Sequence, residues 1–227
     1  MRRRLLICGL AVQNARMATA ATVIGPGGRA LWLRWVIAST LGLAAGQVLF
    51  ALLDATIGDM GELGDGIAHY VGLPLAGAAF GFAQWRVLRQ FVERSAWAIV
   101  AAAVGLLVGY VVGFALAGPP IDFLLGYVFM GTAAAIAQWL ALRRSVARSG
   151  WWIPASVGAF IVGGIAAVGA AVAGLGDALG SGEVAFLILV LILGLIVGVI
   201  SSAITGAALL WVLDQSSRRQ PASTAKS

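Results

Sequence analysis

The sequence predicts an all-α fold: a polytopic membrane helical bundle of six transmembrane helices, built as three hairpins that repeat in parallel. Three observations predict it. The chain of 227 residues is 61% hydrophobic and 11% charged, with a mean hydropathy of +0.98, whereas soluble globular chains have about 45–50% apolar and about 25% charged residues. Six apolar runs approach the roughly 20 residues that cross a bilayer. A polar motif also occurs twice, 54 residues apart.

The apolar runs define a transmembrane domain that we place at residues 31–213. Only short segments separate the runs, so no soluble domain fits between them. Consecutive runs pair into hairpins at about 31–89, 93–147 and 149–213. The six runs are residues 35–53, 67–85, 97–117, 121–141, 152–172 and 184–211.

Residues 1–30 are predicted to be a disordered basic leader, and residues 214–227 a disordered cytoplasmic tail. The start "MRRRLLICGLAV" has features of a signal peptide, but its apolar stretch is short for one. A degenerate twin-arginine signal and translation from Met17 are the alternatives. The sequence "GPGG" at 25–28 is expected to separate the leader from the first run.

The fifteen Lys and Arg residues fall in four places: the N-terminal segment, the loops after the second and fourth runs, and the tail. The other loops carry seven of the nine acids. Basic residues near the ends of spans are retained in the cytoplasm. This pattern predicts a multi-pass protein of the inner (plasma) membrane with both termini cytoplasmic. The net charge of +6 then reflects topology and contact with anionic lipids, and no nucleic-acid binding is expected.

The repeat extends beyond the quoted motif. Residues 72–109 align with residues 126–163 without a gap and share sixteen identities in 38 positions. A weaker third copy keeps Gly198 and Trp211 but has Leu210 in place of the glutamine. Each copy holds an even number of runs, so we expect parallel repeats, and not the inverted repeats of many transporters. Each hairpin is expected to enter the membrane near a tryptophan: Trp35, Trp97 or Trp151.

The repeated motif G-x4-G-x6-Q-W-x2-L-R, followed by R-S-x-W, ends at Trp97 in one copy and at Trp151 in the other. It resembles a group of small, multi-spanning bacterial membrane proteins to which no activity is assigned. The resemblance covers about residues 35–211. It implies a bacterial inner-membrane protein, and it carries no functional residue over to this chain.

The motif glutamines, Gln84 and Gln138, are predicted to be polar helix-packing residues. On a helix, Gln84 shares a face with Gly77 and Gly81, and such small-residue faces are where membrane helices approach one another. An interhelical hydrogen bond contributes about 0.6 kcal/mol, up to roughly 2. Because the third copy has leucine there, Gln→Leu is expected to cost under about 1–2 kcal/mol. A functional polar site at the cytoplasmic mouth is the alternative.

Two further sets of residues are assigned to the membrane environment. Glycines four residues apart allow close helix packing, within the chain or, as the alternative, in a homodimer; they are Gly105, Gly109 and Gly113. Tryptophan rings prefer the membrane interface, and an arginine four residues later can lie over the ring. The predicted interfacial anchors are Trp85, Arg89, Trp97, Trp139, Arg143, Trp151 and Trp211.

No catalytic, cofactor-binding or metal site is predicted, and we expect no enzyme. The single Cys8 and single His69 exclude a cysteine cluster and a histidine triad. Acids before His69 offer oxygen ligands to a cation but lack the EF-hand register, so a solvated loop is the simpler interpretation. These acids are Asp54, Asp59, Glu62 and Asp65.

The central parts of the six runs contain no ionisable residue, whereas ion pumps usually need one. The sequence therefore favours a structural or accessory membrane component. Its expected partners are membrane lipids, including anionic lipids, and another membrane protein or a second copy of the chain. The alternative is a transporter or permeation pathway for a small neutral or weakly polar solute.

Overall fold

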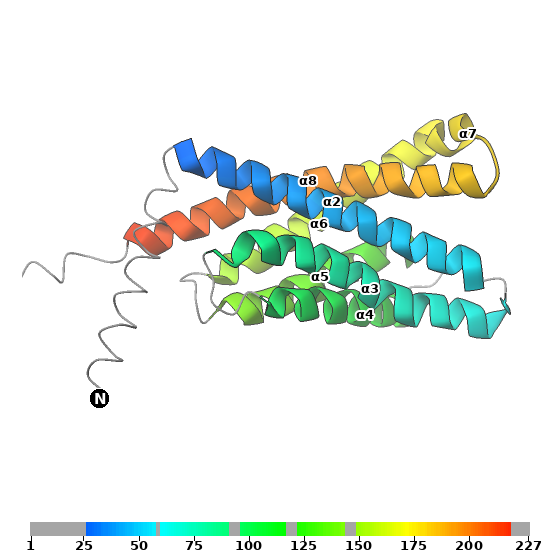
Figure 1. Cartoon of the computed structure of the whole chain (residues 1–227), viewed down its shortest axis with the longest axis horizontal. Helices are drawn as coiled ribbons and strands as arrows, with labels where there is room; N and C mark the ends of the chain where they lie inside the picture. Colours follow the sequence, from blue (N-terminus) through cyan, green and yellow to red (C-terminus); the bar gives the residue numbers. More distant parts are fainter. Residues whose placement is uncertain (1–25, 58–59, 91–95, 117–121, 144–148, 219–227) are drawn as a thin grey trace, which may run out of the picture.

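The structure is a computed structural model that describes residues 26–57, 60–90, 96–116, 122–143 and 149–218. These residues form helices and contain no strand. The long helices are α2 (Pro26–Ile57), α3 (Glu62–Leu88), α4 (Trp97–Leu116), α5 (Asp122–Leu142), α6 (Trp152–Ala170) and α8 (Glu183–Arg218) (Figure 1). Each of the six predicted apolar runs therefore lies mainly within one helix.

Short irregular helices surround α6. The 3-10 turn η3 (Ser149–Trp151) precedes it, and the π-helical η4 (Ala171–Leu175) joins it to α7 (Gly176–Leu179). Gly174 has a φ of 87°, a left-handed conformation that glycine adopts without steric penalty. This residue redirects the chain from α6 into α7.

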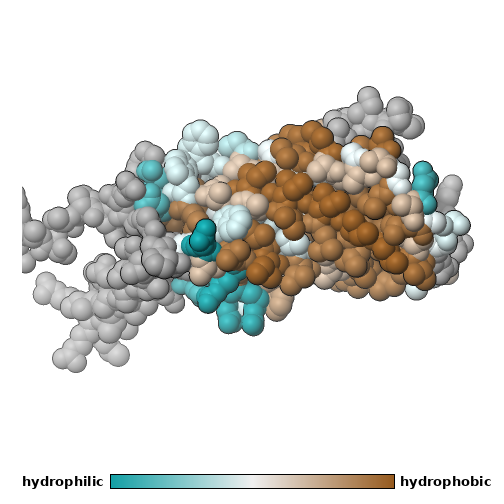
Figure 2. Space-filling view, turned by 90° about the horizontal axis from the view of Figure 1, so that it is seen from above, coloured by the Kyte–Doolittle hydropathy of each residue, from teal (hydrophilic) through white to brown (hydrophobic). Residues whose placement is uncertain are grey.

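The described helices have the length and composition of a membrane protein. Four are long and apolar enough to cross a membrane: Gly28–Ile57, Gly66–Leu88, Ser149–Leu179 and Val184–Gln215. Two shorter apolar stretches, Trp97–Gly113 and Val128–Leu140, lie in α4 and α5. Figure 2 shows hydrophobic side chains over most of one face, with hydrophilic ones towards the ends. An apolar outer surface of this kind suits a lipid environment.

The six long helices form a closed ring. Helix α2 packs against α3, α3 against α4, α4 against α5, α5 against α6, and α6 against α8; α8 then packs against α2. Figure 1 shows α8 and α2 crossing near the middle of the molecule and separating towards both ends. Each helix thus has two main neighbours, and the ring encloses an interior that all six can reach.

Glycines set the close approach of neighbouring helices. A Cβ atom added at Gly77 or Gly81 of α3 would lie 2.6 Å from a backbone oxygen of α4. A Cβ added at Gly105 or Gly109 of α4 would overlap the backbone of α5 at Ala134 and Met130, respectively. Gly113 is also buried. These glycines face helices of the same chain, where a small residue lets two backbones touch.

Two helices extend past the predicted boundaries. The helix α2 begins at Pro26, so the last three residues of "GPGG" belong to the first helix and it starts before the predicted boundary at residue 30. Proline is favoured at the first helical position because the N–H it lacks would have no partner there. Likewise α8 continues to Arg218, beyond the predicted start of the tail at residue 214. The rest of the predicted leader and tail, residues 1–25 and 219–227, lies outside the described residues.

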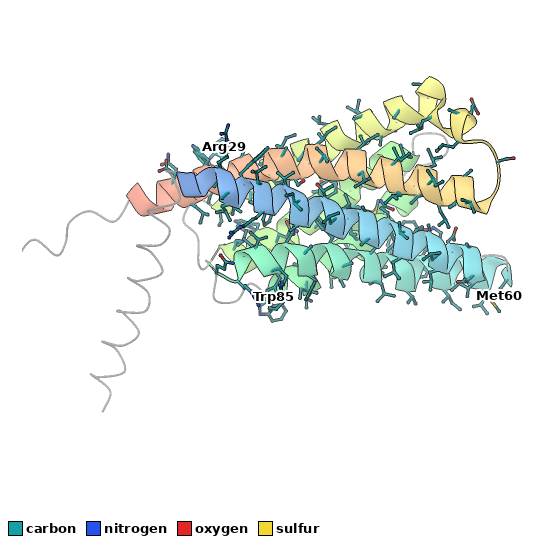
Figure 3. All side chains as sticks on the ribbon, turned by 45° about the horizontal axis from the view of Figure 1, so that its top comes forward. Arg29, Met60 and Trp85 are labelled. Carbon is teal, nitrogen blue, oxygen red and sulfur yellow. The ribbon has the colours of Figure 1, made fainter. Side chains whose placement is uncertain are left out.

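Charge separates the two ends of the ring. Helices that alternate in direction bring the start of α2 and the ends of α3 and α5 together; in Figure 3, Arg29 and Trp85 lie towards one end and Met60 at the other. We call the first the basic end; its described arginines are Arg29, Arg34, Arg86, Arg89 and Arg143. The opposite, acidic end carries Asp54 and Asp177.

Candidate functional site

The interior near the basic end is closed by tightly packed side chains from all six helices. At its centre, Trp35 of α2 has no exposed surface, and Trp152 of α6 is 2% exposed. Their rings meet edge to face, with centroids 5.7 Å apart and planes at 84°, a favourable arrangement for two aromatic rings. We call this pair the tryptophan plug. Trp35 is thus buried inside the bundle, whereas Trp97 and Trp151 are exposed.

The two motif glutamines bond to each other inside the ring. The Nε2 of Gln138 donates to the Oε1 of Gln84 over 2.8 Å, and the Nε1 of Trp152 donates to the Oε1 of Gln138 over 3.0 Å. Both glutamines are buried. Helices α3 and α5 are not neighbours in the ring, so these side chains meet across its interior. The bonds connect α3, α5 and α6 beside the plug.

A second set of polar bonds joins α2 to α8. The Nε1 of Trp35 donates to the Oγ1 of Thr205 over 3.1 Å, and the hydroxyls of Thr40 and Ser202 lie 3.1 Å apart. Together with the glutamines, these residues form a buried band around the plug. We call it the polar layer; its members are Ser39, Thr40, Gln84, Gln138, Ser156, Ser201, Ser202 and Thr205.

Two members of the polar layer differ from the rest. The hydroxyl oxygens of Ser39 and Ser156 are buried and have no hydrogen-bond partner among the described residues. By contrast, Thr205 donates to the carbonyl oxygen of Ser201 in its own helix over 2.9 Å. No sequence pattern distinguishes these serines, because isolated serines in an apolar run are common and carry no spacing signal.

Beyond the polar layer, towards the acidic end, the described helices line a partly open chamber of about 480 Å³. All six long helices line it. One wall residue from each helix, in order along the chain, is Gln47, His69, Tyr110, Met130, Phe160 and Val197. Among the described residues that line the chamber, none is an Asp, Glu, Lys or Arg.

The chamber's polar groups come from three helices. The ring of His69 stacks on Tyr110, with centroids 4.9 Å apart and planes at 23°, and it meets Phe50 edge to face at 5.2 Å. His69, which follows the acidic loop in the sequence, thus lies in the chamber wall. The helical spacing of His69, Leu73 and Ala76 could have predicted this position, because the three residues share a helix face and all line the chamber.

Within the described residues, no group of three or more His, Cys, Asp or Glu side chains is placed to hold a metal ion. The cation site considered for the loop before His69 is thus not formed by the part of the chain that the structure describes. Asp59 lies outside this part, as do the side chains of Glu62 and Asp65.

The predicted interfacial anchors lie near the basic end. The guanidinium of Arg89 lies 5.5 Å from the centre of the Trp85 ring, and that of Arg143 lies 5.5 Å from the centre of the Trp139 ring. The two motif copies thus give equal geometries. The remaining anchors are exposed: Trp97 and Trp151 by 60% each, and Trp211 by 41%.

Comparison of the chain with protein-family models, with curated proteins and with solved structures gives no match. Only the residues of the interior themselves therefore indicate what it can bind. The chamber offers apolar walls, one amide, one imidazole and one phenol. These groups can enclose an apolar body and form hydrogen bonds to a few neutral polar atoms.

Proposed function

We propose that this chain is an integral membrane protein whose central chamber binds a small, mostly apolar molecule with a neutral hydrogen-bonding group, as one step of a permeation pathway. The chamber carries this proposal. Protein interiors normally pack to a density of about 0.74, and ligand pockets occupy about 300–1,000 Å³. A cavity of about 480 Å³ reached by all six helices is unnecessary in a purely structural bundle, so it favours transport over the accessory role.

The lining determines the class of molecule. A charged group moved from water into this chamber would lose its hydration without meeting an opposite charge, which is costly. A neutral group can instead bond to the Gln47 amide while the rest of the molecule contacts the aliphatic and aromatic wall. Ions and strongly polar metabolites are therefore poor candidates.

We further propose six membrane spans in three parallel hairpins, with the basic end in the cytoplasm of a bacterial cell and the protein in its inner membrane. Helices α4 and α5 have 20 and 21 residues, enough to cross about 30 Å of hydrocarbon at 1.5 Å per residue. The matched Arg89–Trp85 and Arg143–Trp139 pairs support both the repeat and contact with anionic lipids. No enzymatic activity is proposed.

The chamber is tested with prodan, a neutral fluorescent probe, titrated into the purified protein in nanodiscs. The variant Leu73→Trp fills the chamber from α3, and its matched control Leu75→Trp adds the same ring on the outer face of that helix, where Leu75 is 44% exposed. We expect Leu73→Trp to weaken probe binding about tenfold or more, equivalent to about 1.4 kcal/mol, and Leu75→Trp to leave it unchanged. Equal affinities for the two variants would show that the probe binds elsewhere.

Transport is tested separately by the rate at which prodan equilibrates across proteoliposomes. A higher rate than in protein-free vesicles, lost in Leu73→Trp and kept in Leu75→Trp, supports permeation. Binding without any change in rate contradicts the pathway and leaves a binding protein.

A further inference from the structure

Gln47 differs from the two motif glutamines inside the ring. Gln84 and Gln138 are buried and bond to each other. Gln47, on α2, lines the chamber and forms no hydrogen bond with another described residue. An amide accepts hydrogen bonds at its oxygen and donates two at its nitrogen. The bonding capacity of Gln47 is therefore available to a molecule in the chamber.

A glycine of α8 defines the depth of the Gln47 side chain. A Cβ atom added at Gly194 would lie 3.2 Å from the Cγ of Gln47 and 3.5 Å from its Cβ. The aliphatic part of Gln47 thus packs on the bare backbone of α8. Because the amide group is bonded to Cγ, it lies close to the level of Gly194.

The chamber is closed on one side of this level and exposed on the other. Val197, three residues after Gly194, is 1% exposed, whereas Phe186, eight residues before it, is 48% exposed. Both line the chamber. At about 1.5 Å per residue, the floor at Val197 lies about 4–5 Å from the level of Gly194, and the mouth at Phe186 lies about 12 Å away in the other direction. Leu43, one turn before Gln47 on α2, is also buried, which agrees with a floor about one turn below the amide.

The rest of the described lining offers little polar competition. Besides Gln47, its polar side chains are His69 and Tyr110, whose rings stack on each other. From Gly194 to the mouth, the α8 wall consists of Leu193, Val190, Leu189 and Phe186. A bound molecule would therefore contact hydrocarbon along most of its length and meet an available amide near the floor.

We propose that Gln47 selects the ligand of the chamber: an elongated neutral molecule with an oxygen, carbonyl or hydroxyl, near its leading end and an apolar tail that extends to the mouth. This inference rests on the proposed function and adds the selecting residue and the shape of the molecule. A fully extended chain advances about 3.5 Å per three bonds. About four bonds then fit between the oxygen-bearing carbon and the floor, and about ten fit between it and the mouth. The Gln47 amide N–H donates to the ligand oxygen.

The test compares straight-chain ketones of about thirteen carbons that differ in the position of the carbonyl, each supplied to the protein in nanodiscs at equal mole fraction. Their equal composition gives them nearly equal solubility in the bilayer, so hydrophobicity does not separate them. Native mass spectrometry measures the fraction of protein that carries one ketone. The isomer with the carbonyl at the fifth carbon should bind about three- to tenfold more tightly than the isomer with the carbonyl at the seventh, the range for one hydrogen bond.

Two variants locate the preference. In Gln47→Leu, which keeps a similar volume but has no amide, the two isomers should bind equally. In Leu73→Trp, which fills the chamber, both should bind about tenfold or more weakly, whereas the control Leu75→Trp should behave as the unmodified protein.

Equal binding of the two isomers to the unmodified protein would overturn the role of Gln47, and this comparison does not depend on any variant folding. A preference that survives in Gln47→Leu would overturn it as well. Prodan binding is the separate readout of the chamber. Prodan bound without any isomer preference would overturn this inference and leave the proposed function standing, whereas absence of both prodan and ketone binding would overturn both.

Discussion

Replacement of Gln138 by leucine should destabilise the protein more than replacement of Gln84. Gln138 takes part in two buried bonds, at 2.8 and 3.0 Å, whereas Gln84 takes part in the first alone. Gln138→Leu leaves the Gln84 oxygen and the Trp152 N–H unpaired, and each such group costs about 1–3 kcal/mol, giving a loss of about 2–6 kcal/mol. Gln84→Leu leaves only the Gln138 amide nitrogen unpaired and should cost about 1–3 kcal/mol.

The double variant gives the sharper test. With both glutamines replaced, only the Trp152 N–H remains unpaired, so the double variant should be more stable than Gln138→Leu alone. Thermal unfolding in detergent measures the difference, at about 2–4 °C per kcal/mol for a chain of this size. A double variant whose loss equals the sum of the single losses would refute the shared network. Equal losses below about 1 kcal/mol would instead support the sequence-based expectation that leucine is tolerated.

Two further predictions concern packing and topology. Gly109→Leu should lower Tm strongly or prevent folding because its side chain would overlap the α5 backbone at Met130. The control Gly158→Leu, in helix α6 with open space around it, should be tolerated. Similar Tm values for the two variants would contradict the packing. In a Cys8→Ser background, Ser181→Cys should react with an impermeant thiol reagent in intact cells, because its loop is expected outside. Ser145→Cys should react only after lysis, because basic loops stay in the cytoplasm. The reverse pattern would invert the proposed orientation.

The positions of the helices could be predicted from hydrophobicity, because every long apolar run must bury its backbone polar groups in a helix if it lies in lipid. The ends could not. Pro26 and Arg218 extend their helices through residues that are not apolar, and a search for apolar runs stops before them. The preference of proline for the first helical position was the sequence signal that could have placed the start of α2 at Pro26.

The interior was predictable only in part. The glutamines share a helix face with small residues, which correctly indicated burial. Their mutual bond was not predictable, since α3 and α5 are not neighbours in the ring and the pattern along one helix does not show which distant helix its face meets. The chamber was not predictable either. Its walls are ordinary aliphatic and aromatic residues, and no local pattern distinguishes residues that line a cavity from residues that fill a core.

At the tryptophan plug, the two copies of the repeat have different residues and make different contacts. Trp152 aligns with Ala98 in the other copy, and both are buried. Two large rings at equivalent depths would compete for one central space, so alanine on α4 leaves room for the ring that comes from α6. The Trp152 N–H then bonds to Gln138 and not to Gln84. Two equivalent glutamines thereby acquire unequal roles, and this inequality is why Gln138→Leu and Gln84→Leu should differ.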